Sequence, residues 1–251
     1  MSWPVNVRET CAKSILSRSG VYDYALNPYI GCEHSCTYCY ARFMKRFSGH
    51  REPWGEFVDV KVNAPALLQR EIGRKRPGRV WVSGVCDPYQ PLERKYGLTR
   101  RCLEILVRHG WPVTVQTKSP LVVRDIDLLR RGDGVEVGLS VPTADDHVRQ
   151  LFEPAAPPIE ERLEALETLH RAGVRTYAMI APMLPGAGGL ADLLAGNVDY
   201  VLIDRMNYHH ADRVYRMHNL EWAMSVAFFA EEGRKLAARL VEQGVDCRLL
   251  F

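Results

Sequence analysis

The sequence lacks the segments that mark secreted and membrane-spanning proteins. Residues 1–20 contain no apolar run, so we see no signal peptide. The most apolar stretch, residues 177–196, holds two prolines, four glycines and an aspartate, which indicates a strand, a loop and a helix rather than a membrane span. The seven cysteines are odd in number, which argues against a disulfide framework in a chain of this length. We therefore expect a cytoplasmic protein with reduced thiols.

Several chemical signatures are also absent. The sequence has no phosphate-binding glycine loop, no Ser-His-Asp signature and no internal repeat. The segment Gly186-Ala187-Gly188-Gly189 is only a weak indication of phosphate binding. The segment 209–218 is rich in residue types that bind metals: His209, His210, Asp212 and His218. Because the spacing of these residues is irregular, we interpret the segment as a polar loop.

The composition is that of an ordinary globular protein, with 47% hydrophobic and 25% charged residues. The length of 251 residues predicts a single domain over residues 1–251. Charge is unevenly spread, because residues 1–125 hold 20 Lys and Arg against 11 Asp and Glu. This basic half is compatible with an anionic partner such as a nucleic acid, and also with a solvated basic helix end.

Three cysteines fall within eight residues, at Cys32, Cys36 and Cys39, with the spacing C-x3-C-x2-C. A loop this short directs three thiolates at one centre, and three thiolates leave one corner of a four-iron cluster open for a substrate or cofactor. Gly31 lets the chain turn sharply before the first cysteine. A zinc site that adds His34 as a fourth ligand is an alternative, although zinc ligands more commonly come as two separated pairs.

Strand-like and helix-like segments alternate along most of the chain. We expect strands at residues 21–30, 79–82, 112–116, 135–139, 175–180 and 200–203, with a seventh at 247–251. We expect helices at residues 41–47, 66–72, 99–109, 124–131, 159–172, 190–195 and 220–243. This alternation predicts right-handed βαβ units around a parallel sheet, and so an incomplete β/α barrel. Residues 1–20 would form an N-terminal arm, about 21–205 the barrel core, and about 206–251 a C-terminal helical extension.

Chemically unusual residues follow nearly every expected strand, where β/α barrels collect their chemistry. They are Cys32, Cys86-Asp87, Lys118-Ser119, Ser140, Pro182 and Asp204-Arg205.

Three short segments narrow the interpretation of the cysteine motif: Asn27-Pro28-Tyr29-Ile30-Gly31-Cys32, Tyr38-Cys39-Tyr40-Ala41 and Asp87-Pro88-Tyr89-Gln90-Pro91. With them the sequence resembles the radical S-adenosylmethionine (SAM) superfamily, in its spore photoproduct lyase-like branch, from about residue 24 to 185. The resemblance implies a partial (β/α)6 TIM-type barrel, a [4Fe-4S] cluster, SAM, and an external one-electron donor of the flavodoxin or ferredoxin type. It also implies reductive cleavage of SAM to a 5′-deoxyadenosyl radical, which abstracts a hydrogen atom from a substrate.

The resemblance also assigns site residues. It implies that Cys32, Cys36 and Cys39 bind the cluster. Four further residues match positions that contact SAM: Tyr38 near the adenine, Lys118 at the carboxylate or ribose, Ser140 after the fourth strand, and Pro182 at the backbone site for the adenine. Each also has a structural interpretation, as a packed ring, a surface lysine, a loop-capping hydroxyl or a strand end.

Cys86 ends the second expected strand. Spore photoproduct lyase uses a cysteine near this strand end as a hydrogen-atom donor, and an offset of two residues keeps Cys86 on the same strand face. The resemblance therefore makes Cys86 a candidate catalytic residue. The alternative is a small buried apolar side chain, which free cysteines commonly are.

The sequence predicts a radical SAM enzyme whose substrate it does not identify. One alternative is repair of nucleic-acid lesions, as in spore photoproduct lyase. The other is a non-enzymatic iron–sulfur or zinc protein.

Overall fold

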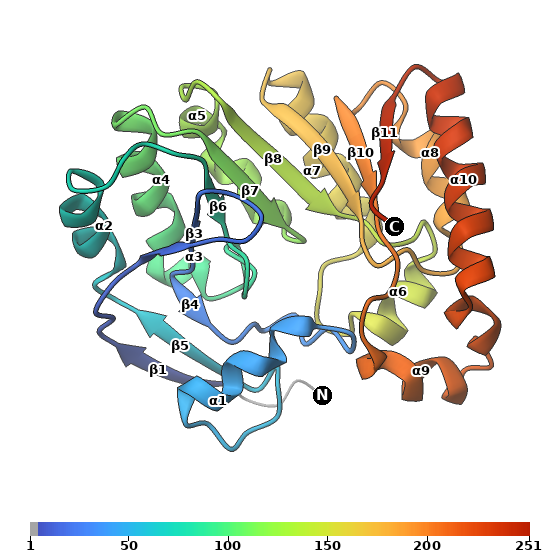
Figure 1. Cartoon of the computed structure of the whole chain (residues 1–251), viewed down its shortest axis with the longest axis horizontal. Coiled ribbons are helices and arrows are strands. Elements are labelled where there is room, and N and C mark those ends of the chain that lie inside the picture. The colour runs from blue at the N-terminus through green and yellow to red at the C-terminus, as the bar shows by residue number, and fades with distance from the viewer. Residues whose placement is uncertain (1–4) are drawn as a thin grey trace. The chain divides into compact units, whose positions relative to one another are not determined.

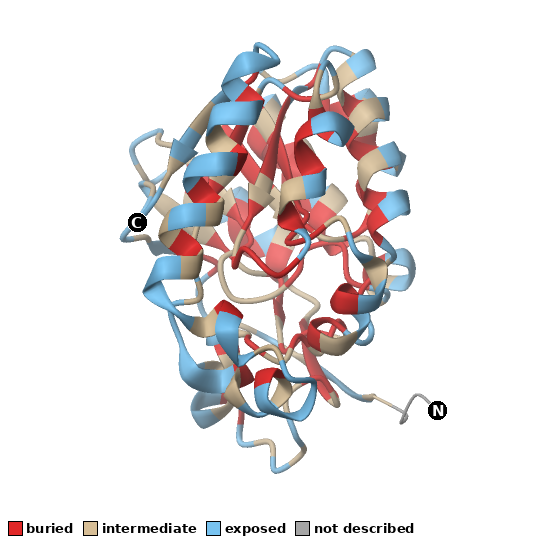
Figure 2. Ribbon diagram, turned by 90° about the vertical axis from the view of Figure 1, so that its right-hand side faces the viewer, coloured by how far each residue is buried: buried red, intermediate tan, exposed pale blue. Residues whose placement is uncertain are grey.

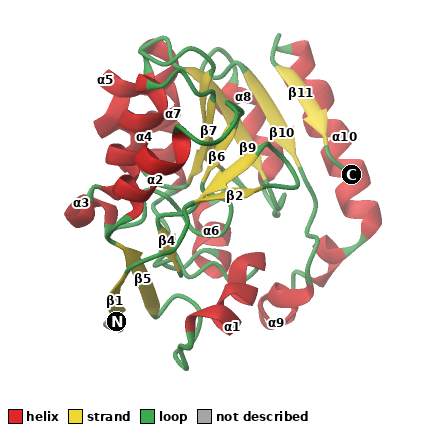
Figure 3. Ribbon diagram, turned by 60° about the vertical axis from the view of Figure 1, so that its left-hand side comes forward, coloured by secondary structure: helices red, strands yellow, loops and turns green. Residues whose placement is uncertain are grey.

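The computed structural model describes residues 5–251, which form two compact units (Figure 1). The first unit comprises the residues up to Ser35 together with Ala41–Val137. The second comprises Cys36–Tyr40 together with Gly138–Phe251. Parallel strands alternate with helices in both units, which confirms the predicted α/β class (Figure 3).

The main sheet of the first unit contains the strands β2 (Leu16–Arg18), β3 (Tyr24–Leu26), β6 (Val80–Val82) and β7 (Val113–Thr117). Strand β2 pairs antiparallel with β3, and β3, β6 and β7 are parallel neighbours, in register at Leu26, Val82 and Val115. The helices of this unit are α1 (Lys45–Ser48), α2 (Ala64–Ile72), α3 (Glu93–Tyr96), α4 (Leu98–Arg108) and α5 (Ile126–Leu129), with the 3-10 helices η1 (Tyr40–Met44) and η2 (Pro120–Asp125) beside α1 and α5.

A smaller sheet of the first unit corrects three predictions. Strand β5 (Phe57–Lys61) pairs in parallel with β1 (Asn6–Thr10) and antiparallel with β4 (Tyr29–Ile30). Residues 5–20 are therefore not an arm, and the expected strand at 21–30 is divided between two sheets as β3 and β4. A strand also lies between the helices expected at 41–47 and 66–72, where none was expected. The β1–β5 pairing joins residues 51 positions apart and the β4–β5 pairing joins residues 29 to 31 positions apart, so no local pattern reveals them. Residues 1–4 of the expected arm lie outside the described residues.

The second unit holds the parallel strands β9 (Arg175–Ile180), β10 (Tyr200–Ile203) and β11 (Asp246–Leu249). Strand β8 (Val135–Ser140) begins in the first unit and ends in the second. The helices of the second unit are α6 (Asp146–Phe152), α7 (Ile159–Arg171), α8 (Leu190–Leu194), α9 (Asp212–Met217) and α10 (Val226–Glu242), with the 3-10 helices η3 (Ala187–Gly189), η4 (His209–Ala211) and η5 (Glu221–Met224).

Two further predictions in the second unit are wrong. The long helix expected at 220–243 is interrupted at Ser225, whose extended backbone ends η5 and whose hydroxyl caps α10 by accepting from the amide of Phe228. Residues 209–218, interpreted as a polar loop, form η4 and α9. Ala211 and Tyr215 are buried there, so tertiary packing stabilises a helix with a short apolar face.

Burial follows the sheet. Figure 2 shows the central strands largely buried and the outward helix faces exposed. Helix α7 differs from an ordinary amphipathic helix, because its buried face includes the charged side chain of Arg162 as well as Leu166 and Leu169. Among the described residues, no helix is long and apolar enough to cross a membrane.

Candidate functional site

The cysteine loop, residues 31–40, begins at a position that only glycine fits. Gly31 has a φ of 91°, and a Cβ there would lie 2.2 Å from the carbonyl oxygen of Phe57. Cys32 and Cys36 are buried, and Cys39 is half-buried. The turn therefore brings the chain from β4 into a loop whose thiols are shielded from water.

The first part of the cysteine loop is held by the segment Asp87–Leu92 of the same unit. The amide of Glu33 donates to Oε1 of Gln90 at 3.0 Å, and Nε2 of Gln90 donates to the carbonyl of Gly31 at 3.3 Å. The Glu33 carboxylate in turn accepts from the amide of Leu92 at 2.8 Å. Hydrogen bonds to the segment Asp87–Leu92 thus fix the backbone conformation of residues 31–33.

Asp87 is the centre of the polar contacts in this part of the first unit. Its carboxylate accepts from the hydroxyl of Thr117 at 2.6 Å and from the amides of Lys118 at 2.7 Å and Tyr89 at 2.9 Å. Nε2 of His34, a buried residue of the cysteine loop, lies 3.2 Å from the same carboxylate. Burial alone would raise the pKa of Asp87, but His34, Thr117 and the Lys118 amide together lower that pKa to about 2. Asp87 is therefore an anion that joins the end of β7 to the cysteine loop.

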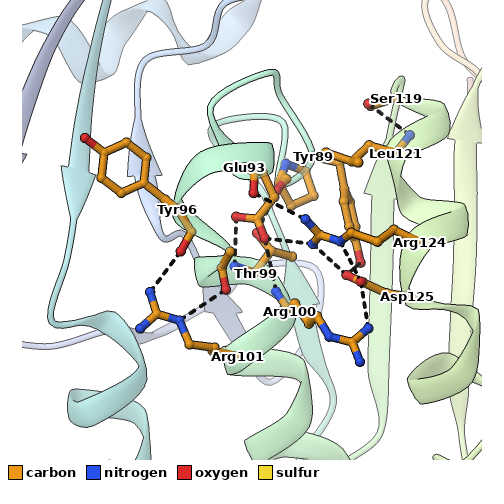
Figure 4. A network of polar contacts seen from close by, with 12 residues as sticks. Tyr89, Glu93, Tyr96, Thr99, Arg100, Arg101, Ser119, Leu121, Arg124 and Asp125 are labelled. Atoms are coloured by element: carbon orange, nitrogen blue, oxygen red, sulfur yellow. Dashed lines mark hydrogen bonds and ion pairs between the residues drawn. The ribbon is translucent and has the colours of Figure 1, made fainter.

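A second polar network fixes the segment that follows Asp87. The buried carboxylate of Glu93 accepts from the hydroxyl of Tyr29. It also accepts from the amide of Thr99 and the guanidinium of Arg124 (Figure 4). Beside it, the hydroxyl of Tyr89 donates to Asp125 at 3.0 Å. The segment 87–93 is consequently ordered before it meets any ligand.

The second part of the cysteine loop is held by helix α6. The amide and hydroxyl of Thr37 both donate to the carbonyl of Phe152, at 2.8 and 3.1 Å. The hydroxyl of Tyr38 donates to Glu153, which follows α6. Cys36 and Tyr38 belong to a buried apolar cluster with Phe152 and Tyr215, and Cys39 packs against it.

A buried ion pair connects this part of the loop to the end of β8. Glu153 and Arg162 are fully buried, and their carboxylate and guanidinium groups lie 2.5 Å apart. Arg162 also donates to the carbonyl of Ser140 at 2.9 Å. Burial and the neighbouring Glu153 charge raise the pKa of Tyr38, so its hydroxyl stays protonated as a donor.

The structure brings some of the predicted site residues together within each unit. In the first unit, Lys118 follows β7 and is tied to Asp87 through its amide. In the second unit, Tyr38 and Ser140 are joined through Glu153 and Arg162. Pro182 is buried directly after β9, and the next amide, of Met183, donates to the carbonyl of Asp204 at 2.8 Å.

Sequence reasoning missed Glu153 and Arg162 as residues that position the loop. One signal was available for Arg162. It lies three residues after Ile159 and four before Leu166, on the apolar face of α7, where a charged residue requires a buried partner. Glu153 had no comparable signal, because it follows a helix that the sequence did not predict.

Cys86 has a packed and protonated thiol. Its Sγ lies 2.9 Å from the hydroxyl of Ser83, which is in turn 2.6 Å from Oδ1 of Asn27. The side chain packs against a buried cluster that includes Tyr29 and Leu98. Burial raises the pKa of Cys86 to about 11, so the group is S–H at neutral pH.

The thiols of the cysteine loop are the kind of ligand that a four-iron cluster requires. Among residues 5–251, no three His, Cys, Asp or Glu side chains are arranged to hold one metal ion. A four-iron cluster makes a different demand, because each thiolate binds an iron of its own. Three thiols of one short loop, two of them buried, meet that demand chemically.

Comparison with known proteins identifies the family. Residues 26–188 match the radical SAM superfamily. The chain belongs to this superfamily. Members of the radical SAM superfamily use a [4Fe-4S] cluster and SAM, so the cofactors predicted from the sequence are confirmed for the family.

Relatives within the radical SAM superfamily match only part of their own length. An uncharacterized protein of Methanocaldococcus jannaschii is 36% identical over 179 residues, which are 71% of this chain and 64% of that protein. A radical SAM Nalpha-GlyT isomerase of Pseudomonas phage M6 is 26% identical over 161 residues, which are 63% of this chain and 33% of that protein. The chain thus spans less than two thirds of these relatives.

The predicted fold is confirmed by a solved structure. A spore photoproduct lyase variant with bound AdoMet and dinucleoside spore photoproduct has a TM-score of 0.71 to this chain and 15% sequence identity, covering 98% of this chain and 82% of that one. The chain therefore has the partial β/α barrel fold of the radical SAM enzymes.

Proposed function

We propose that Cys32, Cys36 and Cys39 hold a [4Fe-4S] cluster and that the protein is a radical SAM enzyme. When bound, the cluster passes one electron from an external flavodoxin- or ferredoxin-type donor to SAM, which yields methionine and the 5′-deoxyadenosyl radical that takes a hydrogen atom from the substrate. The observation that carries this proposal is the hydrogen-bonded support of the cysteine loop at residues 31–34 and at residues 37–38. Thiolate ligands must stay reduced, which supports the cytoplasmic location expected from the sequence.

The residues that would receive SAM follow consecutive strands. Lys118 after β7 supplies an ammonium group for the SAM carboxylate or ribose, and Ser140 ends β8 with a hydroxyl. Pro182 after β9 lies where backbone groups would meet the adenine, and Tyr38 adds an aromatic ring. These four positions come from the resemblance to the family, and Lys118, Ser140 and Pro182 also lie at strand ends, where β/α barrels bind their ligands.

The test is anaerobic reconstitution with iron and sulfide, reduction, and chromatography for 5′-deoxyadenosine. We expect wild-type protein to form it with SAM, and Cys32→Ala, Cys36→Ala and Cys39→Ala each to abolish it. Cys11→Ala is the matched control, because Cys11 is an exposed thiol outside the loop. Product formation by any of the three loop variants would contradict the ligand assignment.

The same preparation separates the enzyme from a non-enzymatic protein. A cluster with an open iron changes its EPR signal when SAM is added, whereas an electron carrier with four ligands does not. A zinc protein would be colourless after anaerobic purification.

We further propose Cys86 as a hydrogen-atom donor to the substrate radical. Its high pKa keeps the hydrogen on sulfur, and the bonded chain from Asn27 through Ser83 holds the thiol in place. In D2O the thiol becomes S–D, so the product should gain one deuterium from wild-type protein and none from Cys86→Ala. Equal deuterium incorporation by both proteins would refute the role.

A nucleic acid is the substrate class that we favour. One fold relative is described with a bound dinucleoside spore photoproduct, and the basic first half of the chain is compatible with an anionic partner. Exposed aromatic residues of the second unit also support a nucleic-acid substrate.

A further inference from the structure

An aromatic stack stands on the surface of the second unit. The rings of Tyr40 and Tyr208 lie 6.1 Å apart with an angle of 17° between their planes. The ring of His210 follows Tyr208 at 5.7 Å and 6°. Tyr40 and Tyr208 are 39% and 52% exposed, so three nearly parallel rings are presented to solvent rather than packed in the core.

A small pocket lies against this stack, and one of its lining residues has a buried hydroxyl without a partner. It is lined by Met206, Asn207, Tyr208, His209, Asp212, Tyr215 and Met224. Tyr215 is 1% exposed, and its hydroxyl makes no hydrogen bond within residues 5–251. Such a group costs about 1–3 kcal/mol when it is left unsatisfied, so its presence in a pocket points to a ligand that supplies an acceptor.

The aromatic stack and the pocket adjoin the cysteine loop within the second unit. Tyr40 directly follows Cys39 in the sequence. Tyr215 shares its buried cluster with Cys36 and Tyr38, and packs edge to face on Phe152 at 4.7 Å. A molecule held here is consequently next to residues that we assign to the cluster loop.

Charge near the stack favours an anionic ligand over a neutral one. Arg205 follows β10 and Arg213 lies on α9, and both side chains are exposed. Asp212 contacts His209 and Arg216, whereas Asp204 accepts only from neutral groups, the Asn207 side chain and the amide of Arg205. Residues 204–216 hold three arginines against two aspartates. The two arginines are exposed cations a few residues from Tyr208 and His210 in the sequence, and cations together with aromatic rings are the combination that binds single-stranded nucleic acids.

We propose that Tyr40, Tyr208, His210 and the Tyr215 pocket form a site for an unstacked base of a single-stranded nucleic acid. One base adds to the exposed aromatic stack, and a carbonyl oxygen of the same or the adjacent nucleotide accepts from the Tyr215 hydroxyl. Arg205 and Arg213 contact the flanking phosphates. The proposal rests on the proposed function and deepens it, because it names the residues that hold the nucleic-acid substrate.

The test uses the reconstituted full-length protein with SAM and a fluorescein-labelled twelve-residue deoxythymidine oligonucleotide. We expect Tyr208→Ala to weaken binding about tenfold or more, since base–aromatic stacking contributes about 1–3 kcal/mol per base and 1.4 kcal/mol is a factor of ten. Tyr208→Phe keeps the ring and should bind as wild type. Tyr215→Phe removes only the donor and should weaken binding about threefold to tenfold.

Three further measurements test whether the base contacts this aromatic stack. An abasic oligonucleotide of the same length should bind wild-type protein about as weakly as the thymidine oligonucleotide binds Tyr208→Ala. Phe47→Ala removes another exposed aromatic ring and should leave binding unchanged. A 2-aminopurine placed in the oligonucleotide should lose fluorescence on binding wild-type protein but not Tyr208→Ala.

Equal binding of the abasic and thymidine oligonucleotides would overturn the base site, as would wild-type affinity in a folded Tyr208→Ala variant. Saturation by an aromatic peptide with no oligonucleotide binding would overturn it in favour of a peptide substrate. A separate measurement tests the proposed function: if wild-type protein forms no 5′-deoxyadenosine, the proposed function is wrong. That result alone leaves the binding measurements valid.

Discussion

At the scale of single residues, the carboxylate of Asp87 orders the end of β7 and the beginning of the cysteine loop. Its pKa of about 2 lies below the ordinary aspartate value of 3.8, so the ionised form stabilises the folded state. This contribution is fully present above pH 4, where Asp87 is ionised in the unfolded chain as well. It is lost as pH falls through the folded pKa.

We predict that Asp87→Asn lowers the free energy of unfolding by about 2 kcal/mol at pH 7, the equivalent of the shift in pKa. The difference from wild type should shrink progressively below pH 4. Urea denaturation of both proteins between pH 7 and pH 3 measures it. A difference that does not depend on pH would show that Asp87 contributes through packing alone.

Arg162 leads to a second prediction about a single residue. Its removal leaves Glu153 as an uncompensated charge in the core, which costs about 3–5 kcal/mol. Arg162→Met should therefore unfold at much lower urea concentration than wild type. The double variant Glu153→Gln with Arg162→Met should regain part of the loss, because the buried charge is gone. A double variant no more stable than Arg162→Met would refute the argument.

How far the sequence predicts the site depends on how close its parts lie in the chain. Cys32, Cys36 and Cys39 are recognisable because their spacing is itself the signal. Glu153 is not recognisable as a partner of Tyr38, because 115 positions separate the two residues. Sequence patterns report local periodicity, and they do not report which distant side chains meet.

At the scale of elements, the interruption at Ser225 shows how a cap overrides a periodic pattern. The apolar repeat of residues 220–243 suggested one helix, but the Ser225 hydroxyl begins a new one by accepting from the amide of Phe228 at 3.1 Å. The same pattern cannot distinguish a helix interior from two helices that share an apolar face.

We predict that Ser225→Ala lowers the free energy of unfolding by about 1 kcal/mol, the usual cost of losing an N-cap. Ser225→Asp keeps an acceptor at the cap and should be close to wild type. Thermal and urea unfolding of the three proteins measure the effect. Equal losses in both variants would mean that the hydroxyl acts in some way other than capping.

At the scale of the whole molecule, the central parallel strands were predicted more accurately than the edges. The strands at 175–180 and 200–203 coincide with β9 and β10, because buried β-rich runs bounded by glycine are strong local signals. Strands β1 and β5 escaped prediction because each is short and pairs with a partner distant in the sequence. Strand β4 was predicted only as the end of the strand at 21–30.

Binding of SAM should stabilise the whole cluster-loaded protein. A ligand that binds only the folded state, present at a hundred times its dissociation constant, adds about 2.7 kcal/mol. For a chain of this size that corresponds to a rise in Tm of about 5–11 °C. Anaerobic calorimetry with and without SAM measures the shift, and Cys39→Ala should show none. An equal shift in Cys39→Ala would mean that SAM binds without the open iron.

The hydrogen bonds that hold Thr37 and Tyr38 also have a consequence while the chain is being synthesised. Both residues find their partners in Phe152 and Glu153, 115 positions later. At about 5–20 residues per second the ribosome needs roughly 6–23 seconds to make that intervening stretch. The nascent chain therefore presents its three thiols for many seconds before helix α6 exists to order them. Iron loading in the cell is expected to follow translation of residue 153 rather than accompany emergence of the cysteines.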